Sequence, residues 1–96
     1  PDGNRVVVGT REQQMWTGCL VNQLTFAWRR PAAGESLAGK LRSAQPPRAM
    51  TVTGIRDGVM RVDFALPIQG VAPGQSLVLY DGDAVVGGGI IQEALR

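Results

Sequence analysis

Apolar and polar positions alternate in the middle of the chain. One set of positions holds Leu37, Gly39 and Leu41, and the intervening set includes Lys40 and Arg42. Successive side chains of a β-strand point to opposite faces of the sheet. The pattern therefore predicts a strand with Lys40 and Arg42 on its outer face.

Large apolar residues also recur at every second position through Leu24, Phe26 and Trp28. This spacing predicts one buried strand face, with Trp28 in the core. We interpret Trp16 as structural too, because a base-stacking platform needs an exposed ring, which is the rarer placement of tryptophan.

An Asp-Gly pair between two apolar runs predicts a β-hairpin. Arg56-Asp57-Gly58 separates the runs 50–55 and 59–64. In the second run, alternation predicts that three side chains face the core, namely Met60, Val62 and Phe64.

The same pattern recurs around Asp81-Gly82-Asp83, between strands expected at 76–80 and 84–86. A last short strand is expected at 88–92. Gly87-Gly88-Gly89 has no Lys-Ser/Thr pair or amphipathic helix after it, so it does not match a phosphate-binding loop. We interpret this glycine run as a strand turning a corner.

Strand patterns dominate the remainder as well. Residues 4–9 form a β-branched run, whereas 11–16 could form a short helix, and 30–34 is the best candidate for an internal linker. The fold class expected from the pattern is all-β, as a small antiparallel barrel or a sandwich.

The residue inventory removes most catalytic chemistry. The 96 residues include one cysteine, Cys19, and no histidine. This excludes a Ser-His-Asp triad, a Cys-His pair and a Cys/His zinc site built by this chain alone. The closest carboxylates, Asp81 and Asp83, are expected to be solvated turn residues, so neither a catalytic residue nor a metal site is predicted.

Cellular setting is indicated only broadly. The chain begins at Pro1 without an initiator Met or a leader, which we interpret as a piece of a longer protein. Its single cysteine favours a reducing, cytoplasmic location, and no apolar run approaches the ~20 residues of a membrane span.

Basic residues are concentrated in the middle of a chain whose net charge is +2. Between positions 29 and 48 there is one acid, Glu35, against five basic residues, which are Arg29, Arg30, Lys40, Arg42 and Arg48. Four phosphate contacts would give a log-affinity against log-salt slope of about −3.6, which suits an auxiliary nucleic-acid contact. Charge alone favours a solvated basic face.

Three segments resemble a known family. VAPGQS (71–76), LYDGD (79–83) and GGGII (87–91) are similar to TPGQ, FY.G and LGGGII, which follow at the same spacing near the C-terminus of the tRNA-specific 2-thiouridylases. The resemblance extends more loosely over nearly the whole chain. It implies that residues 1–96 form a single C-terminal β-barrel domain, similar to domain 2 of elongation factors, and that 1–30 includes the lead-in strand and connection from a central domain.

The resemblance also implies a function for the parent protein. Family members use ATP, with Mg, in an N-terminal domain to activate the wobble uridine of certain tRNAs, and replace its C2 oxygen with sulfur from a donor protein. This chain lacks the ATP loop and the family's catalytic cysteines, so it is expected to be inactive alone and to hold no cofactor. Its expected partners are tRNA and the N-terminal and central domains, with no membrane.

Three tRNA-binding residues are implied. The family's Arg-Tyr-Arg-Gln segment aligns with Arg42-Ser43-Ala44-Gln45, which carries Arg42 and Ser43 over as contacts, and the glutamine of the Pro-Gly-Gln turn is Gln75. Ser43 and Ala44 replace an aromatic residue and an arginine, so weaker contact is expected. The alternative from a different class is an elongation-factor-like barrel that serves as a protein interaction or spacer module.

Overall fold

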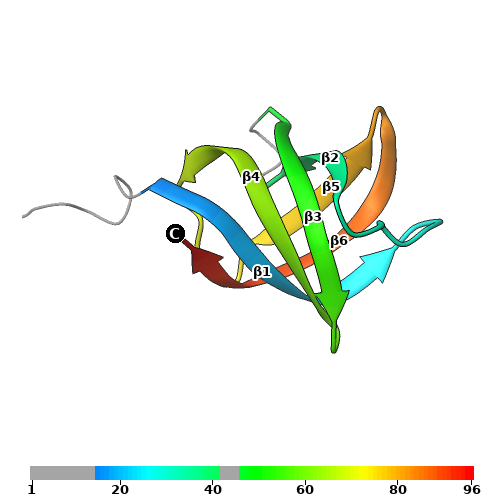
Figure 1. The fold of residues 1–96 in the computed structure, drawn as a ribbon, viewed down its shortest axis with the longest axis horizontal. Coiled ribbons are helices and arrows are strands. Elements are labelled where there is room, and N and C mark those ends of the chain that lie inside the picture. Colours follow the sequence, from blue (N-terminus) through cyan, green and yellow to red (C-terminus); the bar gives the residue numbers. More distant parts are fainter. Residues whose placement is uncertain (1–14, 42–45) are drawn as a thin grey trace, which may run out of the picture.

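Six antiparallel strands close into a barrel, in the order β1-β4-β3-β2-β5-β6 (Figure 1). The computed structural model describes residues 15–41 and 46–96, so the strand expected at 4–9 lies outside the described residues. The strands are β1 (Met15–Phe26), β2 (Glu35–Lys40), β3 (Arg48–Arg56), β4 (Val59–Gln69), β5 (Ser76–Asp81) and β6 (Ala84–Leu95). The expected all-β antiparallel barrel is confirmed. The described ranges contain no helix with the length and apolarity that crossing a membrane requires.

The interior of the barrel is one hydrophobic core without a buried charged or polar residue among the described positions. The core side chains are Cys19, Val21, Leu37, Leu41, Met50, Val52, Met60, Val62, Phe64, Ile68, Val71, Leu77, Leu79, Val86 and Ile91. The core includes every large side chain that the sequence predicted to face inward along β2 and β4, and Gly39, which was predicted to face inward with them, is buried too. Each large apolar side chain buried in this way contributes about 1.5–3 kcal/mol.

Both predicted Asp-Gly hairpins are confirmed. Asp57 and Gly58 connect β3 to β4 with φ angles of 54° and 76°, the left-handed pair that a type I′ turn requires. Gly82, with φ of 61°, lies in the turn between β5 and β6. These turns fix the register that places Met60 and Val62 inside.

The strands expected at 84–86 and 88–92 are instead one continuous strand, β6, with the glycine run in its interior. β6 pairs with β5 on one edge and with β1 on the other. Leu79 pairs with Gly87 and Tyr80 with Val85, so Val86 is an extra residue that forms a bulge. A bulge bends a strand without ending it, which is why the expectation of two strands was wrong.

Trp28 is not in the core, contrary to the prediction, because 59% of its surface is exposed. β1 is irregular between Asn22 and Thr25, where Gln23 adopts a φ of 50°. The irregularity interrupts the alternation of inward and outward side chains that begins at the buried Val21. The strand then ends at Phe26, so Trp28 lies beyond it. Trp16 is half-buried against the core, as its structural interpretation requires.

Residues 15 and 16 belong to β1, so the helix considered for 11–16 is wrong at these positions, and the rest of it lies outside the described residues. Cys19, on the same strand, is completely buried, as expected of a small core residue. Burial, together with the nearby Asp63 carboxylate, raises the pKa of its thiol to about 12. The thiol is therefore protonated and inert at neutral pH.

A network around Arg29 holds the connection from β1 to β2. The guanidinium donates hydrogen bonds to both oxygens of Glu35 and to Asp81 Oδ2 at 3.2 Å. The Ala32 N–H also donates to Glu35 Oε1, at 3.0 Å. The candidate linker at 30–34 is thus an ordered connection inside one barrel.

We predict that Gly88→Ala destabilises the barrel by about 3 kcal/mol. The new Cβ would collide with the Leu77 carbonyl oxygen, and the backbone would have to shift to make room for it. Urea unfolding measures the effect. The matched control is Gly54→Ala, also within a strand, where a Cβ meets nothing within 4 Å. It should change stability by less than about 0.5 kcal/mol. Equal effects of the two variants would contradict the close-approach explanation.

A second prediction concerns acid stability. Hydrogen bonds from Arg29 and from the Ala32 N–H lower the pKa of Glu35 to about 2. A carboxyl whose folded-state pKa lies below its unfolded value stabilises the protein above the unfolded pKa, and this contribution is lost as the pH falls toward the folded pKa. Glu35→Gln should therefore be less stable than the parent at pH 7, with the difference shrinking between about pH 4.5 and pH 2.

Unfolding curves recorded across this pH range provide the measurement. Asp57→Asn is the control, since its ion pair with Arg56 is 3.9 Å long and almost fully exposed. Such pairs contribute little. A stability difference between Glu35→Gln and the parent that stays constant with pH would refute the assignment.

Candidate nucleic-acid interface

Two of the three predicted tRNA contacts, Arg42 and Ser43, lie outside the described residues. The described residues on either side do locate the ends of this connection. Lys40 is the last residue of β2, and Arg48 is the first residue of β3. The position and contacts of Arg42 and Ser43 remain predictions from the family resemblance.

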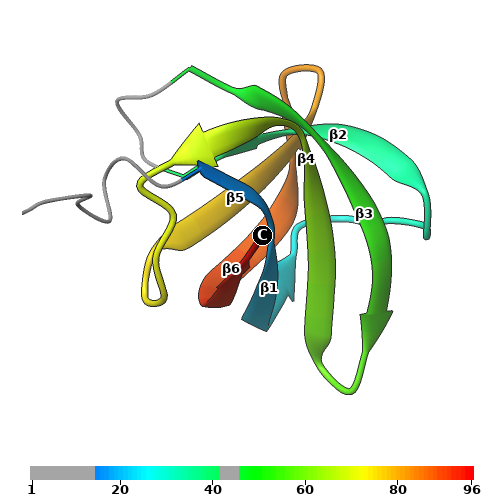
Figure 2. The same cartoon turned by 60° about the vertical axis from the view of Figure 1, so that its left-hand side comes forward.

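The third predicted contact, Gln75, immediately precedes β5, beside the end of β2. Lys40 pairs with Val78, three residues after Gln75, which corresponds to about 10 Å along a strand. Figure 2 shows the end of β2 and the start of β5 on the same side of the barrel. The topology therefore brings the β4–β5 loop close to the end of β2, although 34 positions separate Lys40 from Gly74 in the sequence.

The side-chain amide of Gln75 is turned back onto its own loop. Oε1 accepts a hydrogen bond from the Ala72 N–H at 3.1 Å, and Nε2 donates to the Gly70 carbonyl at 2.8 Å. The family resemblance, which implied a tRNA contact for Gln75, did not indicate these bonds. One N–H and one acceptor site of the amide remain for another partner.

Backbone bonds anchor the same loop to β6. The Gly74 N–H donates to the Ile91 carbonyl at 2.8 Å, and the Ile91 N–H donates to the Gln75 carbonyl at 2.7 Å. Gly70 and Gly74 have positive φ angles of 75° and 93°, which glycine adopts without strain. Gln75 is thus held on a well-defined loop, which limits the conformational entropy that binding would cost.

A shallow hollow of about 330 Å³ lies on the outer face of β3, β2 and β5. Ala49, Ala38 and Tyr80 form one transverse row across these strands and line it. The Lys40 ammonium lies 5.9 Å from the centre of the Tyr80 ring, and Arg48 lines the hollow at one side. The Asp81 carboxylate also lines the hollow and is bonded to Arg29. An aromatic ring with nearby cations and a small-residue floor can accept a nucleobase and its phosphate.

Tyr80 was not singled out from the sequence. Alternation along β5 from the buried Leu77 and Leu79 would have placed its ring on the outer face. The sequence could not indicate that Ala38 of β2 and Ala49 of β3 lie in the same row as this ring, because strand register decides which residues are neighbours across a sheet.

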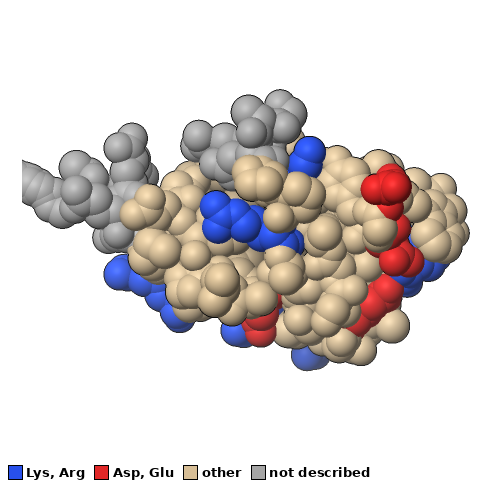
Figure 3. Space-filling view, turned by 90° about the horizontal axis from the view of Figure 1, so that it is seen from above, with Lys and Arg blue, Asp and Glu red and all other residues tan. Residues whose placement is uncertain are grey.

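The central basic residues are not equivalent. Arg29 is occupied by Glu35 and Asp81, and Arg30 lies 5.9 Å from the Phe26 ring. Neither Lys40 nor Arg48 forms an ion pair with a carboxylate among the described residues. In Figure 3 most acidic side chains in view gather toward the right, and most basic ones lie away from them. Phosphate contact is therefore best served by Lys40 and Arg48.

The carboxylates and the glycine run have structural or solvated positions in the described part of the chain. Among the described residues there is no group of three or more side chains able to hold a metal ion. Gly87-Gly88-Gly89 lies inside a strand that is paired on both edges, so it does not fit the phosphates of ATP. Asp81 is bonded to Arg29, and Asp83 is exposed in its turn, as the solvated-turn interpretation expects.

Comparison with known proteins assigns this barrel to a family. Residues 16–91 match the model of the aminomethyltransferase beta-barrel domain. A tRNA-specific 2-thiouridylase MnmA from Shewanella sp. (strain ANA-3) is 40% identical over 89 residues, which are 92% of this chain and 24% of the relative. The MnmA of Cupriavidus taiwanensis is 50% identical over 76% of this chain and 21% of its own length.

A third relative, the tRNA-specific 2-thiouridylase MnmA of Rhodospirillum centenum, is 40% identical over 98% of this chain and 24% of its own length. The chain thus spans about a quarter of the length of the curated relatives that it matches. The resemblance inferred from VAPGQS, LYDGD and GGGII is confirmed. The chain belongs to the aminomethyltransferase beta-barrel domain family.

Proposed function

We propose that this chain is the C-terminal, tRNA-contacting barrel of a tRNA-uridine 2-sulfurtransferase. The main support for the proposal is that 76–98% of the chain matches three tRNA-specific 2-thiouridylases at 40–50% identity. The parent protein would be a cytoplasmic enzyme that thiolates the wobble uridine of tRNA. ATP with Mg would bind in its N-terminal domain, and a partner protein would supply the sulfur.

The contribution of this barrel would be to hold tRNA at the end where β2 finishes and β5 begins. Lys40 and Arg48 supply cations there without a carboxylate partner among the described residues. Tyr80 adds an aromatic ring, and the anchored loop presents Gln75 nearby. Arg42 and Ser43 would extend this surface from the adjoining connection.

The second candidate function is a protein interaction or spacer module. The exposed indole of Trp28 and the exposed side chain of Val85 favour it, because monomeric proteins seldom leave neighbouring large apolar groups in water. The surfaces for the two functions adjoin at Tyr80 and Val85, which pair across β5 and β6, but different residues line them, so the two functions are compatible in one protein.

The parent protein is expected to form 2-thiouridine in tRNA when supplied with ATP, a sulfur donor and unmodified tRNA. Nucleoside mass spectrometry measures the product. Residues 1–96 alone should form none, because the chain has no histidine and its cysteine is buried. A parent protein that binds tRNA but never thiolates it would contradict the proposed activity.

Substitution of the predicted contacts in the parent protein should weaken tRNA binding. Arg42→Ala should lower affinity about tenfold and reduce the salt slope by about 1, because one phosphate contact is lost. Lys40→Ala should have a similar effect. Filter binding at several salt concentrations gives both quantities.

The control is Arg56→Ala, whose side chain is 94% exposed at the far end of β3 (Figure 1). It should leave tRNA affinity unchanged. Gln75→Ala needs a parallel measurement of stability, since its amide also closes the β4–β5 loop. Equal losses from Arg42→Ala and Arg56→Ala would show that binding depends on overall charge rather than on this end of the barrel.

A further inference from the structure

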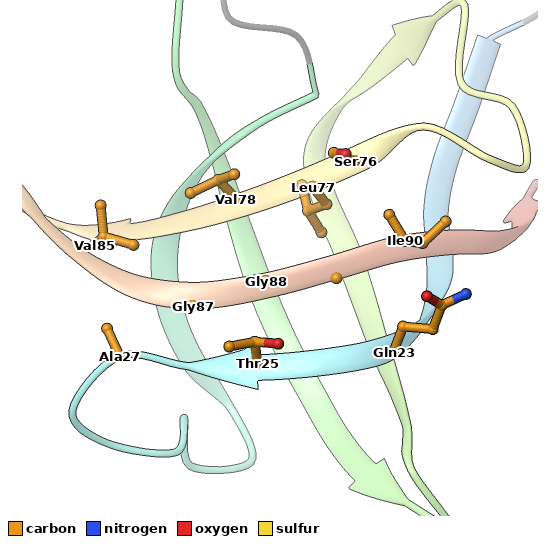
Figure 4. Close-up of a pocket in the computed structure, with 11 residues that line it drawn as sticks. Gln23, Thr25, Ala27, Ser76, Leu77, Val78, Val85, Gly87, Gly88 and Ile90 are labelled. Carbon is orange, nitrogen blue, oxygen red and sulfur yellow. The ribbon is translucent and has the colours of Figure 1, made fainter.

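The glycine run creates a groove on the outer face of β1, β6 and β5. Figure 4 shows β6 passing between Thr25 on β1 and Val78 on β5 with no side chain on Gly87 or Gly88. Val85 stands at one end of this bare stretch and Ile90 at the other. The groove has a volume of about 440 Å³, and no charged residue lines it.

Trp28 lies at the Val85 end of the groove, where it is held in place. Its indole N–H donates to the Val85 carbonyl at 2.9 Å. The Arg29 guanidinium lies 4.9 Å from the ring centre and is itself fixed by Glu35 and Asp81. The ring is therefore ordered although 59% exposed, and docking against it would cost little side-chain entropy.

The chemistry of this face favours a protein partner over RNA. Its exposed groups are the indole of Trp28, the 43% exposed side chain of Val85, and neutral side chains along the groove. The cation beside Trp28, Arg29, is already bonded to two carboxylates, and Lys40 borders only the β5 side of the groove, where it pairs with Val78. RNA binding depends on cations that neutralise phosphates, whereas tryptophan in an apolar setting is typical of the centre of protein interfaces.

The length of the relatives indicates what could cover this face. The chain spans 24% of a tRNA-specific 2-thiouridylase such as that of Shewanella sp. (strain ANA-3), so most of such a protein lies outside it. We propose that Trp28, Val85 and the glycine-floored groove form the docking surface for an apolar segment from another domain of the same polypeptide. This inference rests on the proposed function only in requiring that a longer parent protein exists.

The proposal explains two features together. Glycines at 87–89 allow β6 to approach its neighbours, and they also leave a floor on which another chain segment can lie close to the sheet. The Trp28 docking surface adjoins the row of Ala49, Ala38 and Tyr80 at β5, because Tyr80 pairs with Val85, and it extends from there over β6 and β1. Domain docking and tRNA contact would therefore use adjoining surfaces that are lined by different residues.

The test measures cysteine accessibility in the full-length parent protein. Val85→Cys and Leu66→Cys are each labelled with a maleimide, and mass spectrometry of the labelled peptide gives the rate relative to denatured protein. Leu66 is the matched control, because it is 75% exposed on β4, and the buried Cys19 contributes no background. The covered surface should make position 85 label about tenfold or more slowly than position 66.

Removing the Trp28 side chain should reverse the protection of position 85. Adding Trp28→Ala to the Val85→Cys protein should raise labelling about tenfold, because the docked segment loses its largest apolar contact. Oxidation of Trp28 by hydroxyl radicals in the unmodified parent gives the same information without a substitution, and it should be slower than that of the exposed Met15.

Several results would overturn the proposal. Equal relative labelling at positions 85 and 66 would show that the surface is not covered. Protection that appears only when tRNA is added would identify tRNA as the occupant, and protection that is lost on dilution would identify a second copy of the protein. A gene that encodes no further domain would also contradict the proposal. Measuring tRNA affinity on the same samples separates this inference from the proposed function. Loss of tRNA binding with position 85 still protected would refute the function alone.

Discussion

Pairing of β6 with both β1 and β5 closes the barrel, and the rest of the structure depends on it. The strand has to approach the Leu77 carbonyl on one side and the Asn22 carbonyl on the other, and at both places a Cβ would collide. Glycine at 88 and 89 removes these collisions, and the bulge at Val86 supplies the curvature. Closure in turn pairs both edges of every strand that the structure describes and completes the core around Leu79 and Ile91.

The same constraint shapes the outside of the molecule. A strand interior without side chains leaves a groove, and the register of β6 places Val85 at its end beside Trp28. Arg29 connects this region to the β1–β2 connection and to the start of the β5–β6 turn through Glu35 and Asp81. Arg29, whose charge looks available for phosphate in the sequence, is therefore used internally on this side, whereas Lys40 and Arg48 form no ion pair with a carboxylate among the described residues.

Much of the fold could be predicted from local pattern. Leu37 and Leu41, the hairpin at Asp57-Gly58, and the inward set of β4 all follow from a period of two and from turn chemistry, which act over a few residues. The prediction was wrong where a local irregularity intervened. Gln23 interrupts the alternation of β1 and puts Trp28 outside, and the bulge at Val86 joins two expected strands into one. The irregularity at Gln23 has no distinctive local sequence, whereas the glycine run after Val86 indicated a corner but not that the strand continues through it.

The sequence by itself determined the fold class, the absence of histidine-based chemistry and the family, because composition, turn signals and motifs such as VAPGQS belong to the chain whatever its conformation. Only the tertiary structure decided which side chains meet. It placed Lys40 beside Tyr80, occupied Arg29 with Glu35 and Asp81, turned the Gln75 amide onto its own loop and exposed Trp28. The physical reason is that these contacts depend on strand register and closure, which join residues far apart in sequence and leave no trace in local spacing.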